Sequence, residues 1–141
     1  MTKRERVITA IQGGEADHTA TGFSLHFPKE RAFGEEAVKS HLEFFEKTDT
    51  DILKIMNENL VPDVGDIRVP EDWNKIPSYS LKDPFMQNQL HLVEDILQKC
   101  DSSAFLMGTI HGICASAIHP IEARYGYEAV RNPVLQSYQG K

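Results

Sequence analysis

The sequence predicts an α/β fold with a parallel sheet, because short apolar runs alternate with helical patterns along the chain. Each run ends abruptly in polar residues, as a buried parallel strand does at its carboxyl end. The three runs cover residues 22–25, 52–56 and 104–110, and they lead into His26, into Asn57 and Glu58, and into His111. Ligands of such folds bind at the carboxyl ends of the strands, so these polar residues are the first candidates for a functional site.

The first helix is expected over residues 2–12. Thr2 and Glu5 have the spacing of a capping box, in which each side chain bonds the backbone of the other residue. Gly13 and Gly14 follow the apolar positions and end the helix. The run 22–25 then forms the first strand, and helical spacing returns over residues 35–47 before the strand 52–56.

A further helix is expected to begin at Asp83 and Pro84, an N-cap residue followed by proline at the first helical position. Its apolar stripe consists of Met86, Leu90, Val93, Leu97 and Cys100. After the strand 104–110, residues 113–125 have a helical pattern that Gly126 ends. Pro120 must lie in the first turn of this helix or kink it.

The length, composition and net charge of the chain limit the class of protein to which it can belong. A chain of 141 residues with 40% hydrophobic residues can bury one core, so a single domain over residues 1–141 is expected. The net charge of −6 argues against a nucleic-acid or anionic-membrane partner. No apolar run reaches the ~18 residues of a transmembrane helix, and the N-terminus lacks a secretory pattern. A cytoplasmic location is therefore predicted.

His26, Asn57, Glu58 and His111 would meet at one edge of a parallel sheet. Two imidazoles and a carboxylate at such an edge supply a general base, a general acid and an anion contact. A polar residue at a strand end often only completes a turn, and that alternative stays open for each of the four. His119 lies near the same edge or caps a helix, and Lys29 meets an anionic substrate or is merely solvated.

Several common motifs are missing from the sequence. Residues 108–112 lack the spacing and the lysine of a phosphate-binding loop. Cys100 and Cys114 do not have the spacing of a metal motif, and no metal site is predicted.

Four stretches of the chain resemble proteins of the uroporphyrinogen decarboxylase family. The opening residues 2–7 with 14–18 resemble the start of these proteins, and the strand regions 22–27, 51–58 and 106–112 follow in matching order and spacing. The family fold is a (β/α)8 TIM barrel, typically more than twice this length. The resemblance therefore implies a partial barrel with the N-terminal helix and about three βα units. It also implies a homo-oligomer, or pairing with another chain that completes the sheet.

The resemblance implies a small anionic or tetrapyrrole substrate and carboxy-lyase chemistry. Decarboxylases of the family bind substrate carboxylates with two arginines near the first strand, and these positions are His26 and Glu30 here, with Lys29 beside the second. The aspartate that holds the pyrrole nitrogens corresponds to Glu58, and the active-site tyrosine falls close to His119. The implied catalytic residues are Glu58 and His119, and the implied substrate-binding residues are His26, Lys29, Asn57 and His111. Because both arginine forks are replaced, uroporphyrinogen itself is not the expected substrate.

Two alternatives remain open. The family also includes corrinoid- or coenzyme M-linked methyltransferases, whose zinc ligands lie in later strands. No cofactor is therefore expected within this chain, and zinc or a corrinoid would require downstream strands. The third possibility is a truncated chain without catalysis, acting as an oligomerising or ligand-binding remnant.

Overall fold

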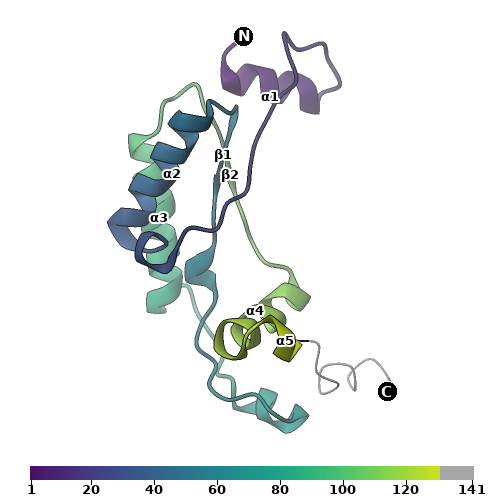
Figure 1. Ribbon diagram of the computed structural model, residues 1–141, viewed down its shortest axis with the longest axis vertical. Helices are drawn as coiled ribbons and strands as arrows, with labels where there is room; N and C mark the ends of the chain where they lie inside the picture. The colour runs from purple at the N-terminus through teal and green to yellow at the C-terminus, as the bar shows by residue number, and fades with distance from the viewer. Residues whose placement is uncertain (131–141) are drawn as a thin grey trace. The chain divides into compact units, whose positions relative to one another are not determined.

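The computed structural model describes residues 1–130 and contains helices and a small parallel sheet (Figure 1). The chain forms two compact units. Unit 1 comprises Met1–Glu58 and Asn88–Ile110, and unit 2 comprises Asn59–Gln87 and the chain from His111 onward. The α/β class predicted from the sequence is confirmed at this level. A single domain over residues 1–141 stays a prediction.

The sheet of unit 1 has two strands, β1 (Ile52–Ile55) and β2 (Phe105–Gly108), which pair in parallel with Ile52 opposite Phe105. The predicted strand over residues 22–25 is reduced to one bridge, in which Gly22 pairs in parallel with Ile52. A Cβ at Gly22 would lie 2.8 Å from the Cβ of Ile52, so only glycine allows this approach. Beyond Gly22 the prediction of a strand is wrong, because the residues that follow do not continue the backbone ladder.

Helices α2 (Gly34–Thr48) and α3 (Pro84–Lys99) lie on the same side of this sheet, as Figure 1 shows. Their apolar faces pack with alternate residues of β1 in one core. The buried members of that core are Ala37, Val38, Phe45, Leu53, Ile55, Leu92, Ile96 and Ala104. Helix α1 (Lys3–Ile11) begins with the predicted capping box between Thr2 and Glu5.

Unit 2 holds the short 3₁₀ helix η3 (Pro70–Lys75), helix α4 (Ile113–Tyr125) and the single turn α5 (Tyr127–Val130). Pro120 lies inside α4 and not in its first turn. Arg124 near the end of α4 bonds both Asp63 (Nη1 to Oδ1, 3.0 Å) and Asp66 (Nε to Oδ1, 2.7 Å) of the preceding loop. Within residues 1–130, no helix has the length and the apolar character needed to cross a membrane.

Candidate functional site

The amino end of β1 is fixed by a partly buried ionic cluster. Arg6 of α1 binds Asp17 through Nε (2.6 Å) and Nη2 (2.9 Å), and its Nη1 donates to Asp51. The backbone N–H of Thr21 donates to the other oxygen of Asp51 at 2.8 Å. Burial alone would raise the pKa of Asp51, but the bonds from Thr21 and Arg6 outweigh it and hold this pKa below its usual value.

The carboxyl end of β1 is held by two side chains from the helices. Met56, the first residue after the strand, donates its N–H to Nε2 of His41 at 3.0 Å, and its carbonyl accepts from Nε2 of Gln89 at 2.9 Å. Nδ1 of His41 donates to the Ala37 carbonyl at 2.7 Å, so this imidazole is neutral with its proton on Nδ1. The chain therefore leaves the ladder at a defined point and turns into the 3₁₀ helix η2 (Glu58–Leu60).

The environment of His41 opposes a charge on its ring. Burial lowers the pKa of His41 below its usual value of 6.5, although the bond to Ala37 and the negative charge of Glu58 act in the opposite direction. The ring of Phe27 contacts the imidazole edge-on, with 4.9 Å between centroids. His41 thus serves as a fixed neutral acceptor beneath the start of η2.

His26 and Glu58 form a hydrogen-bonded pair. Nδ1 of His26 lies 2.7 Å from Oε1 of Glu58, and the carboxylate accepts this bond. The Glu58 side chain is only 18% exposed, whereas the His26 side chain is 72% exposed. The bond fixes the tautomer of His26 and leaves its Nε2 directed to solvent as a proton acceptor or, when protonated, a donor.

Lys54 forms a second polar contact between the same two segments. Its Nζ donates to Oγ of Ser24 at 2.8 Å. Ser24 precedes His26 by two residues, and Lys54 precedes Glu58 by four, so both pairs join the segment after Gly22 to β1 and its continuation.

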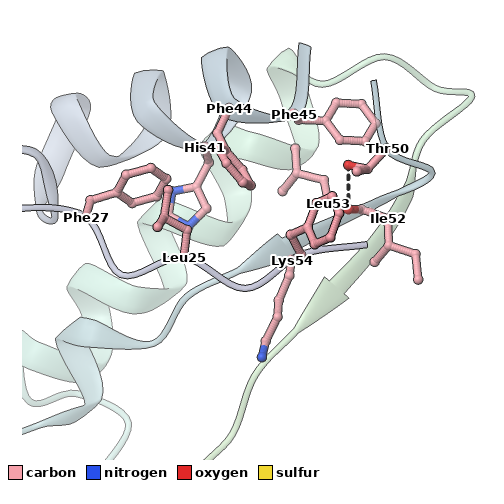
Figure 2. A pocket seen from close by; sticks show the side chains of 10 residues that line it. Leu25, Phe27, His41, Phe44, Phe45, Thr50, Ile52, Leu53 and Lys54 are labelled. Carbon is pink, nitrogen blue, oxygen red and sulfur yellow. Dashed lines mark hydrogen bonds between the residues drawn. The ribbon is translucent and has the colours of Figure 1, made fainter. Parts of the chain in front are cut away.

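Lys54 projects from the face of the sheet opposite α2 and α3. Its neighbours Leu53 and Ile55 belong to the core beneath those helices, and side chains alternate between the faces of a strand. Figure 2 shows Leu53 directed toward Phe45 of α2, while Lys54 extends away from that helix. We call this side of the sheet the open face. It carries Ser24, His26, Ile52, Lys54, Glu58, Phe105 and Met107.

The structure brings together only part of the predicted site. His26 and Glu58 are paired, but Asn57 between Met56 and Glu58 is only 1% exposed, and its Nδ2 has no hydrogen-bond partner among residues 1–130. Lys29 lies in the exposed 3₁₀ helix η1 (Lys29–Arg31).

His111 and His119 belong to unit 2, where their rings lie 4.2 Å apart between centroids. Nδ1 of His119 also lies 3.3 Å from Oε2 of Glu122. Their predicted place at the same edge as His26 stays a prediction.

An apolar hollow lies between α2 and the segment that contains Phe23, Leu25 and Phe27 (Figure 2). Its volume of about 10 Å³ is at the lower limit for a single water molecule. This space is therefore a packing gap beside His41 and not a ligand site.

Sequence reasoning missed Lys54, Ser24, His41 and Gln89. A period-2 reading of residues 52–56 would have found Lys54, because it is the one charged residue in an apolar strand and lies on the face opposite Leu53 and Ile55. Local sequence offers no signal for Gln89 or His41, since both act on the backbone of Met56 from distant parts of the chain.

Comparisons of the chain with protein-family models, curated proteins and solved structures gave no match. No group of three His, Cys, Asp or Glu residues within the described part of the chain is arranged to hold a metal ion. The described donor set therefore does not fit a zinc centre.

Proposed function

We propose that the chain is the N-terminal part of a uroporphyrinogen decarboxylase-like (β/α)8 barrel protein that acts on a carboxylate of an anionic, tetrapyrrole-related small molecule other than uroporphyrinogen. The observation that carries this proposal is the His26–Glu58 pair at the carboxyl end of β1. The parallel strands with both helices on one side support it, because barrel sheets have their helices outside and their ligands at the carboxyl strand ends. A cytoplasmic location belongs to the same proposal.

The roles of the pair follow from its geometry. Glu58 holds the Nδ1 proton of His26 and orients the ring, so Nε2 faces the substrate. A protonated Nε2 binds a substrate carboxylate by a charge-assisted bond. In a decarboxylation the carbon–carbon bond to the carboxylate breaks, carbon dioxide leaves, and the electron pair stays on the substrate carbon. The Nε2 proton of His26 then passes to that carbon.

Binding of coproporphyrin III, a tetrapyrrole with four carboxylates, tests the recognition step on the full chain. A change in the fluorescence of the porphyrin itself should show saturable binding, and Glu58→Gln should weaken it at least tenfold because the carboxylate no longer orients the ring of His26. The exposed Glu46→Gln on α2 is the matched control and should bind like the wild type. Equal binding of the tetramethyl ester, or unchanged affinity in Glu58→Gln, would contradict the proposal.

The reaction itself is tested by release of labelled carbon dioxide from a porphyrinogen that carries a carboxyl-labelled acetate side chain, because the electron pair left by carbon dioxide then lies next to a pyrrole ring that can stabilise it. Loss of a positioned proton donor typically lowers a rate by about 10²–10⁴-fold, and His26→Gln should fall in this range. Binding without any release by the wild-type chain would rule out carboxy-lyase activity on this probe.

A further inference from the structure

We propose that Lys54, with Ser24, forms a carboxylate-binding subsite on the open face, beside the His26–Glu58 pair. The subsite concerns the same face as the proposed function and rests on it for the second polar contact of the ligand. It adds a residue outside the predicted set and a class of ligand: a carboxylate on an apolar body with a second polar group.

Lys54 is the one charged side chain of β1, and its described hydrogen bond goes to a hydroxyl. Leu53 and Ile55, its neighbours in β1, are 3% and 2% exposed, and Lys54 itself is half-buried. A lysine in such a position packs its aliphatic stem against the apolar surface and holds its ammonium toward water, where it can bind an anion. Within residues 1–130 no carboxylate oxygen lies within 4.0 Å of Lys54 Nζ, and its one hydrogen bond goes to the neutral hydroxyl of Ser24.

Apolar side chains share the open face with Lys54. Met107 is opposite Lys54 in the strand register, and Phe105 is opposite Ile52. Met107 is 39% exposed, and Phe105 and Ile52 are half-buried, so this surface is reachable by a small apolar group. Association of that group with the surface removes water from the ammonium and strengthens its bond to an anion.

The second polar contact lies close by. Two residues of extended chain span at most ~7 Å, which limits the distance between the backbones of Ser24 and His26. A ligand whose carboxylate lies at Lys54 can therefore place another polar group at Nε2 of His26 while its apolar part covers Ile52 and Met107.

The donors favour a carboxylate over a phosphate. One ammonium and one hydroxyl match the single charge of a carboxylate. Phosphate sites typically combine a divalent charge with several backbone N–H groups or an arginine fork. No arginine is among the open-face residues defined above, and the described hydrogen bond of Lys54 Nζ goes to the hydroxyl of Ser24.

The test is an NMR titration of the full chain with 3-phenylpropionate, with 3-phenylpropionamide and inorganic phosphate as comparison probes. The carboxylate should shift the amide signals of residues 52–54 and 105–107 in a saturable way, and the amide probe and phosphate should not. Lys54→Met should weaken 3-phenylpropionate binding at least tenfold, Lys54→Arg should retain it, and Ser24→Ala should weaken it about two- to fivefold.

Lys47→Met is the matched control, because Lys47 is an exposed lysine of α2 outside the open face, and the charge change is the same. Far-UV circular dichroism shows that each variant is folded before titration. Unchanged affinity in Lys54→Met, equal binding of the amide probe, or no binding by the wild type would overturn the subsite. These outcomes are independent of the coproporphyrin assay with Glu58→Gln, so failure of the subsite and failure of the proposed function are distinguishable.

Discussion

His41 links the core of unit 1 to the open face through a single backbone amide. Its Nε2 accepts from the N–H of Met56, two residues before Glu58. Protonation of Nε2 would remove this acceptor and place a charge where burial opposes it. The stability of unit 1 and the position of Glu58 should therefore depend on the same imidazole.

The free energy of unfolding should fall as the pH is lowered below 6.5. Since burial lowers the pKa of His41 in the folded chain, the unfolded chain binds a proton below 6.5 that the folded chain does not. The stability from neutral His41 is fully present above the usual pKa and is lost as the pH decreases, by at most about 1.4 kcal/mol per pH unit. Urea unfolding at pH 7.5 and pH 5.5 measures this change.

His41→Gln removes the titrating ring, so the difference between pH 7.5 and pH 5.5 should become smaller in this variant. His91, an exposed residue of α3, provides the control, and His91→Gln should keep the pH dependence of the wild type. An identical pH dependence in wild type and His41→Gln would contradict the assignment.

Gly22 and Gly108 offer a matched pair of glycine substitutions. An added Cβ at Gly22 would meet Ile52 at 2.8 Å, whereas a Cβ at Gly108 would have no atom within 4 Å. Gly22→Ala should therefore lower the free energy of unfolding by about 1–3 kcal/mol, and Gly108→Ala should leave it unchanged or raise it by up to about 1 kcal/mol. Chemical denaturation compares the two, and equal effects would mean that the bridge to Ile52 does not form.

Helix α1 shows how far local signals reach at the scale of an element. The capping box, the stop at Gly13 with φ of 73°, and the start of α3 at Pro84 all agree with the sequence prediction, because each depends on residues within one turn. The segment 22–25 had a strand-like composition, but a strand also requires a partner with matching backbone groups. In this segment only Gly22 has a backbone partner in β1, namely Ile52, and the local sequence does not indicate where this pairing stops.

Removing the cap of α1 should destabilise the chain measurably. Thr2→Ala deletes the hydroxyl that accepts the N–H of Glu5 at 3.1 Å and should lower the free energy of unfolding by about 1 kcal/mol. Thr2→Ser keeps the acceptor and should restore most of the loss. Thermal unfolding of the three chains measures both effects, and equal stability of Thr2→Ala and wild type would show that the cap does not contribute.

At the scale of the whole molecule, sequence reasoning brought His26 and Glu58 together correctly but did not predict what surrounds them. Both residues follow apolar runs, and residues that follow parallel strands lie at the same edge of the sheet, so the parallel topology predicts that they are close together. The burial of Asn57 and the contact of Lys54 with Ser24, 30 residues away in the chain, depend on tertiary packing, which local sequence patterns do not specify.

The edge of β2 is expected to pair with another chain. Within residues 1–130 the sheet ends at β2 and has no further strand beyond it. The N–H of Phe105 bonds Asp51 toward β1, so the next amide, that of Leu106, faces the outer edge. Because unpaired strand edges promote association, we expect a homo-oligomer. Size exclusion with light scattering should therefore give a mass above the 15.9 kDa of one chain.

Hydrogen exchange at the Leu106 amide tests the pairing of the β2 edge at a single residue. In an oligomer that extends the sheet, the Leu106 amide should exchange slowly and more slowly still as the protein concentration rises. A monomer at all concentrations, with fast exchange at Leu106, would contradict the pairing.

The bridge at Gly22 has a consequence for how a ligand would enter. Thr21 accepts backbone bonds from Asp51 and Ile52, but the following residues 23–27 meet β1 and its continuation through the side-chain bonds of Ser24 and His26. This segment should therefore detach by a local opening that costs far less than global unfolding. A bound ligand that contacts Lys54 and His26 would hold residues 23–27 against β1. Ordering this segment costs conformational entropy, so the backbone motion of residues 23–27 would decrease and the observed affinity would be lower than the contacts alone would give.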